Sequence, residues 1–246
     1  MESFLVGLQF LTRIHLRRET KWSDENFGKS VKWFPLIGSV IGLCLCALYF
    51  ALKFFNAPLL TAFLLVAAEI FLTGGLHIDG LTDAADGLFS GRSRERALAI
   101  MKDSLIGSFG LMAFVLLIGL KTTALASVEG NIYLLLIAMP VIGRLNMVVS
   151  VCEYPYAREQ GFGKSFTAYR DRYAVWFAFA TTLLPTLYFG FLYLILIGIG
   201  ILTGLLLNHW IVAKIGGTTG DTYGFVTEVT EAVLAFVFVL LTGGVV

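Results

Sequence analysis

A run of 41 residues without Asp, Glu, Lys or Arg, from Tyr173 to Ala213, constrains the fold of this chain more than any other feature. A helix crosses a bilayer in roughly 20 residues, so the run is long enough for two spans. Of all 246 residues, 57% are hydrophobic and 14% are charged, whereas soluble domains carry about a quarter charged residues. We therefore predict an all-α fold, a polytopic transmembrane helical bundle.

Apolar runs between clusters of charge predict about seven spans. They lie near residues 33–52, 58–76, 105–128, 131–152, 174–194, 195–213 and 230–246. Connections rich in Lys and Arg alternate with connections that carry almost no charged residues. The positive-inside rule therefore places the N-terminus and every long polar loop in the cytoplasm. We expect residues 1–31 to form an amphipathic or re-entrant segment, and residues 1–246 to form a single catalytic domain.

Charge and cysteine usage exclude other classes of protein. A net charge of +1 provides no basic surface for a nucleic acid. The three cysteines lie in apolar runs, so we expect neither a disulfide framework nor a zinc site. Two GKS tripeptides, at 28–30 and 163–165, lack the first glycine of a P-loop. The lipid bilayer is the partner that composition predicts, and the sequence is also compatible with a homo-oligomer.

Three aspartates follow an apolar run in the stretch TGGLHIDGLTDAADG, residues 73–87. On a helix, Asp79, Asp83 and Asp86 fall within about 60° of one another. Like charges on one helix face repel, so a cation must compensate them. Carboxylates and water are the ligands that Mg²⁺ prefers, commonly together with substrate phosphates. The alternative is an ordinary solvated helix terminus, where acidic residues are common.

Other residues of this region are candidates for the same site. Glu69 lies inside the preceding span and would fall about 40° from Asp83 if one helix continued through Gly74 and Gly75. An ionisable residue within a span suggests function. His77 is a candidate general base or metal ligand, or else an interfacial hydrogen bonder. The seven-residue spacing of Gly80 and Gly87 keeps one helix face bare, for close helix packing or for close approach of a substrate.

Later segments add cations and a second acidic group. The cations of residues 92–103 fit phosphate oxygens, although the positive-inside bias alone also explains them. Arg144, within a span, is a counter-charge to Glu69 or a ligand of a substrate phosphate, and a purely structural ion pair is the competing interpretation. Asp221 and Glu228 are about 20° apart on a helix, which suggests a second metal contact or a site that orients hydroxyl groups.

Taken together, these motifs resemble the adenosylcobinamide-GDP ribazoletransferases, the cobalamin-5′-phosphate synthases of the bacterial inner membrane. The resemblance runs from about residue 4 to residue 235 and is carried by FLTRI, WFPLIGSVIG, LTGGLHIDGLTDAADGLFSG, RERALAIMKDSLIGSFG, YPYAREQGFGKSF and IGGTTGDTYGFVTEVTE. It implies that α-ribazole, or its 5′-phosphate, attacks the diphosphate of adenosylcobinamide-GDP. The products are adenosylcobalamin, or its phosphate, and GMP, and the reaction uses Mg²⁺.

Phosphoryl transfer requires positioning and charge neutralisation, and the resemblance suggests a role for each candidate. We expect the metal ligands to be Asp79, Asp83 and Asp86, with Glu69 as a further ligand or as a residue that orients them. One of Asp83, Asp86 or His77 accepts the ribose hydroxyl proton. We expect the substrate-binding residues to be Arg13, Arg92, Lys102, Asp103, Arg144, Asp221 and Glu228.

Two rival functions make different demands on the sequence. A CDP-alcohol phosphotransferase needs D-G-x-x-A-R followed by G-x-x-x-D-x-x-x-D, whereas here Asp79-Gly80 continues with Leu81, Thr82 and Asp83. A transporter that couples to cations through intramembrane acids predicts repeat symmetry between the halves of the chain, and we detect no internal repeat.

Overall fold

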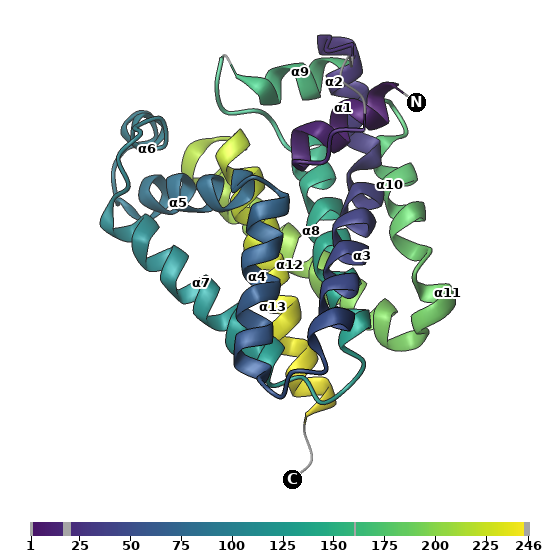
Figure 1. Cartoon of the computed structure of the whole chain (residues 1–246). Helices are drawn as coiled ribbons and strands as arrows, with labels where there is room; N and C mark the ends of the chain where they lie inside the picture. The colour runs from purple at the N-terminus through teal and green to yellow at the C-terminus, as the bar shows by residue number, and fades with distance from the viewer. Residues whose placement is uncertain (1, 17–20, 160, 244–246) are drawn as a thin grey trace.

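The computed structural model describes residues 2–16, 21–159 and 161–243, and within them the regular structure is helical (Figure 1). Five helical segments are long and apolar enough to cross a membrane. These are Asp24–Leu52, which ends in α3 (Phe34–Leu52), α7 (Ser108–Ala126), α8 (Ile132–Glu153), α12 (Phe191–Ile215) and α13 (Gly220–Thr242). The predicted all-α membrane bundle is confirmed.

Shorter helices complete the bundle. α4 (Pro58–Leu72) runs beside α7, and α10 (Ala174–Leu183) with α11 (Thr186–Phe189) forms a further apolar segment. With these two added, the bundle has roughly seven crossings, as predicted. The turn expected near residue 195 lies instead at Gly190, whose φ of 70° suits glycine.

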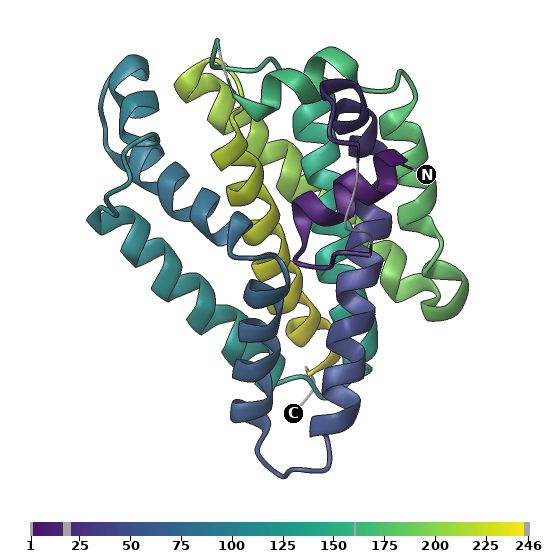
Figure 2. The same cartoon turned by 45° about the horizontal axis from the view of Figure 1, so that its top comes forward.

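The core of the bundle is α8, which is buried along nearly its whole length and packs against α3, α12 and α13 (Figure 2). Glycines let these helices approach closely: a Cβ atom on Gly42 would lie 2.8 Å from the carbonyl oxygen of Leu136. Asn146 donates hydrogen bonds to the Gly200 carbonyl at 2.7 Å and to Thr230 Oγ1 at 2.9 Å. Small residues and interhelical hydrogen bonds are the usual means of packing helices in a bilayer.

The short helices gather at one end of the bundle, opposite the C-terminus (Figure 1). They are α1 (Glu2–Leu11), α2 (Asp24–Ser30), α5 (Leu76–Phe89), α6 (Arg94–Ile100) and α9 (Phe162–Tyr169). α1 buries an apolar face, including Val6 and Leu8, and the rings of Phe27 and Phe166 stack at 4.2 Å between α2 and α9. Residues 17–20 of the predicted N-terminal segment and residues 244–246 of the predicted last span lie outside the described residues.

The last span begins ten residues earlier than predicted, at Gly220 rather than at residue 230. Thr219 caps it: the Thr219 side chain accepts from the Thr222 amide, and the Thr222 hydroxyl accepts from the Thr219 amide at 2.7 Å. Glu228 therefore lies inside the bundle, as Glu231 does, rather than in the preceding loop. Their burial is explained by the cations that they meet there.

Candidate active site

A sharp corner between α4 and α5 determines where the aspartates lie. Gly74 and Gly75 both have left-handed backbone conformations, with φ of 64° and 76°, which favour glycine. The two helices meet there at 91°. α5 consequently turns away from the span and runs across the polar end of the bundle (Figure 1). The helix does not continue from Glu69 to Asp83, so the alignment of these two residues predicted from a straight helix is wrong.

The three aspartates of the stretch do share one helix, α5, as predicted. Asp79 is exposed and Asp83 is half-buried. Burial, together with the nearby carboxylates of Asp79, Asp221 and Asp86, raises the pKa of Asp83 to about 7. Asp221 belongs to the first turn of α13, so this one member of the second acidic group meets the first group, and the site contains an excess of negative charge.

Asp86, in contrast, points to the start of α7. Its Oδ2 atom accepts a hydrogen bond from the Gly107 amide at 2.7 Å, and its Oδ1 atom accepts one from the Gly110 amide at 2.9 Å. A carboxylate at a helix N-terminus satisfies free N–H groups and interacts well with the helix dipole. Asp86 thus links α5 to α7. Each of its oxygens keeps a further lone pair, which is available for a metal or a proton. A role of Asp86 as metal ligand or base therefore stays a prediction.

Close packing of α5 on α13 brings Asp221 of α13 near Asp79 and Asp83 of α5. A Cβ atom on Gly80 would lie 2.8 Å from the Asp221 carbonyl oxygen, and one on Gly224 would lie 2.7 Å from the His77 carbonyl oxygen. Gly87 packs closely against the Ala97 carbonyl of α6 and against the side chain of Met101, the residue that follows α6. Of the two uses considered for the spacing of Gly80 and Gly87, the structure shows close helix packing.

Arg158 is a further residue of the site that the sequence alone does not reveal. Its Nη2 atom donates to Asp221 Oδ2 at 2.5 Å, and both side chains are mostly buried. Arg158 lies within the motif YPYAREQ, at the position where a P-loop would need its first glycine. The neighbouring Ala157 amide donates to the Thr218 carbonyl at 2.8 Å and so holds this polar loop against the bundle. The position of Arg158 depends on this tertiary contact and could not be inferred from sequence spacing.

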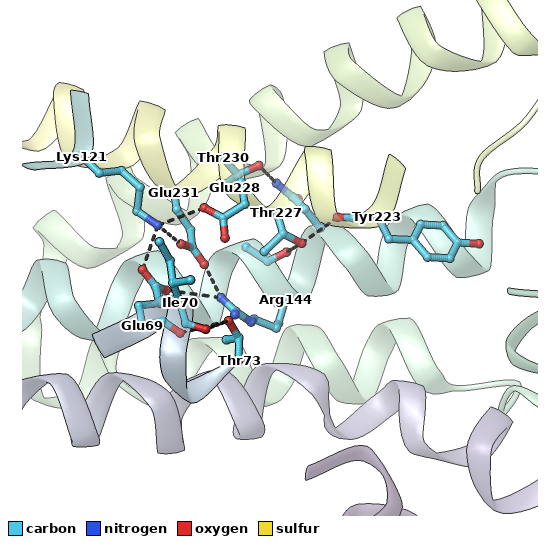
Figure 3. Close-up of polar contacts among 12 residues, drawn as sticks. Glu69, Ile70, Thr73, Lys121, Arg144, Tyr223, Thr227, Glu228, Thr230 and Glu231 are labelled. Atoms are coloured by element: carbon cyan, nitrogen blue, oxygen red, sulfur yellow. Dashed lines mark hydrogen bonds and ion pairs between the residues drawn. The ribbon is translucent and has the colours of Figure 1, made fainter. Parts of the chain in front are cut away.

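A second polar cluster lies inside the bundle (Figure 3). Lys121 Nζ donates to Glu69 Oε2 at 2.8 Å, to Glu228 Oε2 at 3.2 Å and to Glu231 Oε2 at 2.6 Å. Arg144 Nη1 pairs with Glu231 Oε1 and lies 3.8 Å from Glu69 Oε1. We call these five residues the buried ion cluster. The predicted pairing of Arg144 with Glu69 is present, but the shorter contact of Arg144 is with Glu231.

The buried ion cluster separates residues that the sequence analysis had grouped with the aspartates. The Glu69 carboxylate meets Lys121 and Arg144, and Glu228 meets Lys121, so both acids are neutralised by protein cations. Lys121 was missed, although a lysine inside the predicted span 105–128 was a visible signal. His77 is buried next to this cluster, and its Nε2 atom has no hydrogen-bond partner among the described residues.

The other predicted contacts lie at the polar end. The Arg13 amide donates to the Leu72 carbonyl at 2.7 Å, and a Cβ atom on Gly74 would lie 2.9 Å from Arg13 Nε, so this guanidinium sits at the α4–α5 corner. Lys102 lines a cavity of about 530 Å³ together with Arg158. Arg92 and Asp103 are exposed in the connections that flank α6.

A second cavity, of about 560 Å³, opens beside Asp79. Its wall combines apolar side chains such as Ile106 and Phe114 with the backbone of Gly74 and Gly75. A carboxylate at the edge of an apolar cavity is a common arrangement for a small-molecule site.

The donor set fits a hard divalent cation that is shared with a substrate. Across the described part of the chain, no group of three or more His, Cys, Asp or Glu side chains is arranged as a metal site. Mg²⁺ needs fewer protein ligands than that, because one or two carboxylates with substrate phosphates and water complete its shell. Asp79 and Asp83 supply such oxygens, and the carboxylates of Asp79, Asp221 and Asp86 near Asp83 add to burial in raising its pKa.

Comparisons with known proteins agree with the resemblance noted in the sequence. Residues 3–239 match a family model described as cobalamin-5-phosphate synthase. A protein named adenosylcobinamide-GDP ribazoletransferase from Alkaliphilus metalliredigens (strain QYMF) is 38% identical over 99% of this chain and 97% of its own length. Proteins of the same name from Acinetobacter baumannii (strain ATCC 17978) and Brevibacillus brevis are 38% and 36% identical, over 98% and 97% of this chain and 98% of each relative. No solved structure matches at a significant level.

Proposed function

The chain belongs to the cobalamin-5-phosphate synthase family, and from that premise we propose the reaction that it catalyses. It is a transferase of cobalamin biosynthesis. It joins α-ribazole, or its 5′-phosphate, to adenosylcobinamide-GDP, which gives adenosylcobalamin, or its 5′-phosphate, and GMP. The names of the relatives support both the diphosphate substrate and the ribazole group that is transferred to it.

In this reaction a ribose hydroxyl oxygen forms a bond to the phosphorus atom on the cobinamide side of the diphosphate. The bond from that phosphorus to the bridging oxygen breaks, and GMP leaves with that oxygen. The hydroxyl proton passes to a base. Of Asp83, Asp86 and His77, we favour Asp83, because its side chain is half-exposed at the site, whereas His77 is buried. Both Asp86 oxygens already accept amide hydrogen bonds.

The observation that carries the proposal is the convergence of Asp79, Asp83 and Asp221 where α5 crosses α13. Asp79 and Asp83 would hold Mg²⁺, with Asp86 as a further candidate ligand, and the metal would neutralise charge on the diphosphate. A carboxylate that binds Mg²⁺ through one oxygen keeps its other oxygen for a proton.

Cations at the polar end would neutralise the remaining phosphate oxygens. Arg13, Arg92 and Lys102 are our candidates, and Arg158 joins them because it lies beside Asp221. Asp103 and Asp221 would orient hydroxyl groups of the substrates. Glu69, Glu228 and Arg144 lie in the buried ion cluster, so we assign them an indirect role in orienting the helices that carry the site.

The chain is a multi-pass membrane protein. We place it in the bacterial inner membrane with the active site facing the cytoplasm. This orientation is supported by the excess of Lys and Arg in the long polar segments, because the described parts of these segments gather at the end of the bundle where α5 lies. A homo-oligomer is compatible with this arrangement.

The direct test is to incubate the protein, purified in detergent, with adenosylcobinamide-GDP, α-ribazole and Mg²⁺, and to measure GMP release. We expect turnover that Asp83→Asn abolishes while the protein stays folded. Glu129→Gln is the matched control, since Glu129 is exposed in the α7–α8 connection. A folded wild-type preparation that releases no GMP would refute the reaction, and substrate flux into liposomes without turnover would favour a transporter instead.

A further inference from the structure

We propose that Lys121 is a positioning residue of the active site: its buried ammonium group holds α4, α7 and α13 in the arrangement that brings the aspartates together. The inference rests on the proposed function above. Lys121 touches none of the candidate substrate or metal contacts at the polar end, so it would act through the helices that it joins.

The ammonium group lies at the centre of three carboxylates from two helices (Figure 3). Its distances are 2.8 Å to Glu69 of α4, and 3.2 Å and 2.6 Å to Glu228 and Glu231 of α13. Lys121 itself is 2% exposed and belongs to α7. The three donors of one ammonium group are therefore sufficient to connect three helices at a single point.

Each of these helices leads to a different part of the aspartate site. α4 ends at the turn of Gly74 and Gly75, which sets the direction of α5, the helix of Asp79 and Asp83. α13 carries Asp221 in its first turn, two helical turns before Glu228. α7 begins at the amides of Gly107 and Gly110 that hold Asp86. A shift of any one helix relative to the others would change the distances between carboxylates at the polar end.

Stability alone is a weak reason to bury these charges. Removing ions from water is costly, and well-packed apolar residues often support a fold equally well in place of a buried ion pair. Ion pairs that can form at only one relative position of the helices favour that position. In this cluster Lys121 and Arg144 face three carboxylates, so the arrangement depends on the exact position of each helix.

Arg144 cannot replace Lys121 in this role. Arg144 pairs with Glu231 and Glu69 from α8, the central helix, and among the described residues it forms no ion pair or hydrogen bond with α7. Its Nε and Nη2 atoms have no partner among the residues that the structure describes. The ion pairs of Lys121 tie α7, and with it the amides that hold Asp86, to Glu69 of α4 and to Glu228 and Glu231 of α13.

Three variants separate positioning from stability. Lys121→Met removes the ammonium group and leaves the acids with one cation. The double variant Lys121→Met, Glu228→Gln removes a charge of each sign and should be easier to fold. Glu228→Gln alone measures the contribution of Glu228, since Lys121 then keeps Glu69 and Glu231. Lys53→Met, in the loop before α4, controls for loss of a lysine.

Two readouts are needed, and one of them is independent of turnover. The first is the Mg²⁺ concentration that gives half-maximal GMP release, measured separately from kcat. The second is hydrogen exchange at the Gly107 and Gly110 amides, with and without Mg²⁺. For both Lys121 variants we expect the half-saturating Mg²⁺ concentration to rise by about tenfold or more, as for other residues that orient metal ligands, and the two amides to lose protection.

The inference is overturned if either Lys121 variant, folded and monodisperse, keeps the wild-type Mg²⁺ dependence and protected amides, whatever its melting temperature. It is also overturned if both Lys121 variants fail to fold while Glu228→Gln folds, because Lys121 would then be needed for the fold itself. If the wild type releases no GMP, the proposed reaction fails, and the exchange measurements still test the positioning of Asp86.

Discussion

Substituting Gly80 by alanine tests whether the α5–α13 contact builds the active site. A Cβ atom at this position would lie 2.8 Å from the Asp221 carbonyl oxygen, 3.2 Å from Asp221 Cα and 3.3 Å from Gly224 Cα, whereas ordinary van der Waals contacts begin near 3.4 Å. All three neighbours are backbone atoms, so no flexible side chain can move aside. The helices must separate by roughly half an ångström to restore normal contacts.

The expected loss of stability follows from this overlap. Overpacking a close contact typically costs about 1–3 kcal/mol, and Gly80→Ala should fall in this range. Gly119→Ala is the matched control, because Gly119 is also in a helix and its Cβ would meet nothing within 4 Å. There alanine should be neutral, or stabilising by up to about 1 kcal/mol, because of its higher helix propensity.

Equilibrium unfolding in mixed detergent micelles measures the free energies of unfolding, and the half-saturating Mg²⁺ concentration reports on the site. A separation of this size is as large as the whole tolerance of a preorganised site, about 0.5 Å, so Gly80→Ala should also weaken the response to Mg²⁺. Gly224→Ala disturbs the same contact, and the double variant should lose less than the sum of the two single losses. Equal stability and equal Mg²⁺ dependence of Gly80→Ala and Gly119→Ala would refute the reasoning.

Three further predictions concern the aspartates. Asp83→Asn should abolish GMP release without loss of the folded state, and retained turnover would remove Asp83 from the site. Because the folded pKa of Asp83, about 7, lies above its ordinary value of 3.8, Mg²⁺ must displace a proton at low pH. The affinity of the protein for Mg²⁺, measured by titration calorimetry, should fall by up to about tenfold per pH unit below 7. Asp83→Asn should flatten this dependence of Mg²⁺ affinity on pH. Without metal, the folded protein keeps the Asp83 proton up to about pH 7, whereas the unfolded chain releases it near pH 3.8. The free energy of unfolding of the metal-free protein should therefore decrease as the pH rises from 3.8 to 7. Gly107→Ala places a Cβ atom against the Asp86 carboxylate, so it should lower the thermal midpoint, and an unchanged midpoint would argue against the contact of Asp86 with α7.

The membrane bundle and its aspartate helix could be predicted from the sequence because their causes are local. A long charge-free run cannot remain in water, and the helical period alone places Asp79 and Asp83 on one face of α5. The seven-residue spacing of Gly80 and Gly87 likewise marked a bare face. The α5 helix, its shared acidic face and the seven or so crossings all followed from such short-range patterns.

The tertiary structure decided which charges meet. A 91° turn at Gly74 and Gly75 separates Glu69 from Asp83, and an early start of α13 carries Glu228 into the bundle, where it meets Lys121. Lys121 and its acids are 52 to 110 residues apart along the chain, and no periodic pattern connects them. Contacts between helices depend on the angles at which the helices cross, and these angles are set by the close packing of glycines against backbone across the whole bundle.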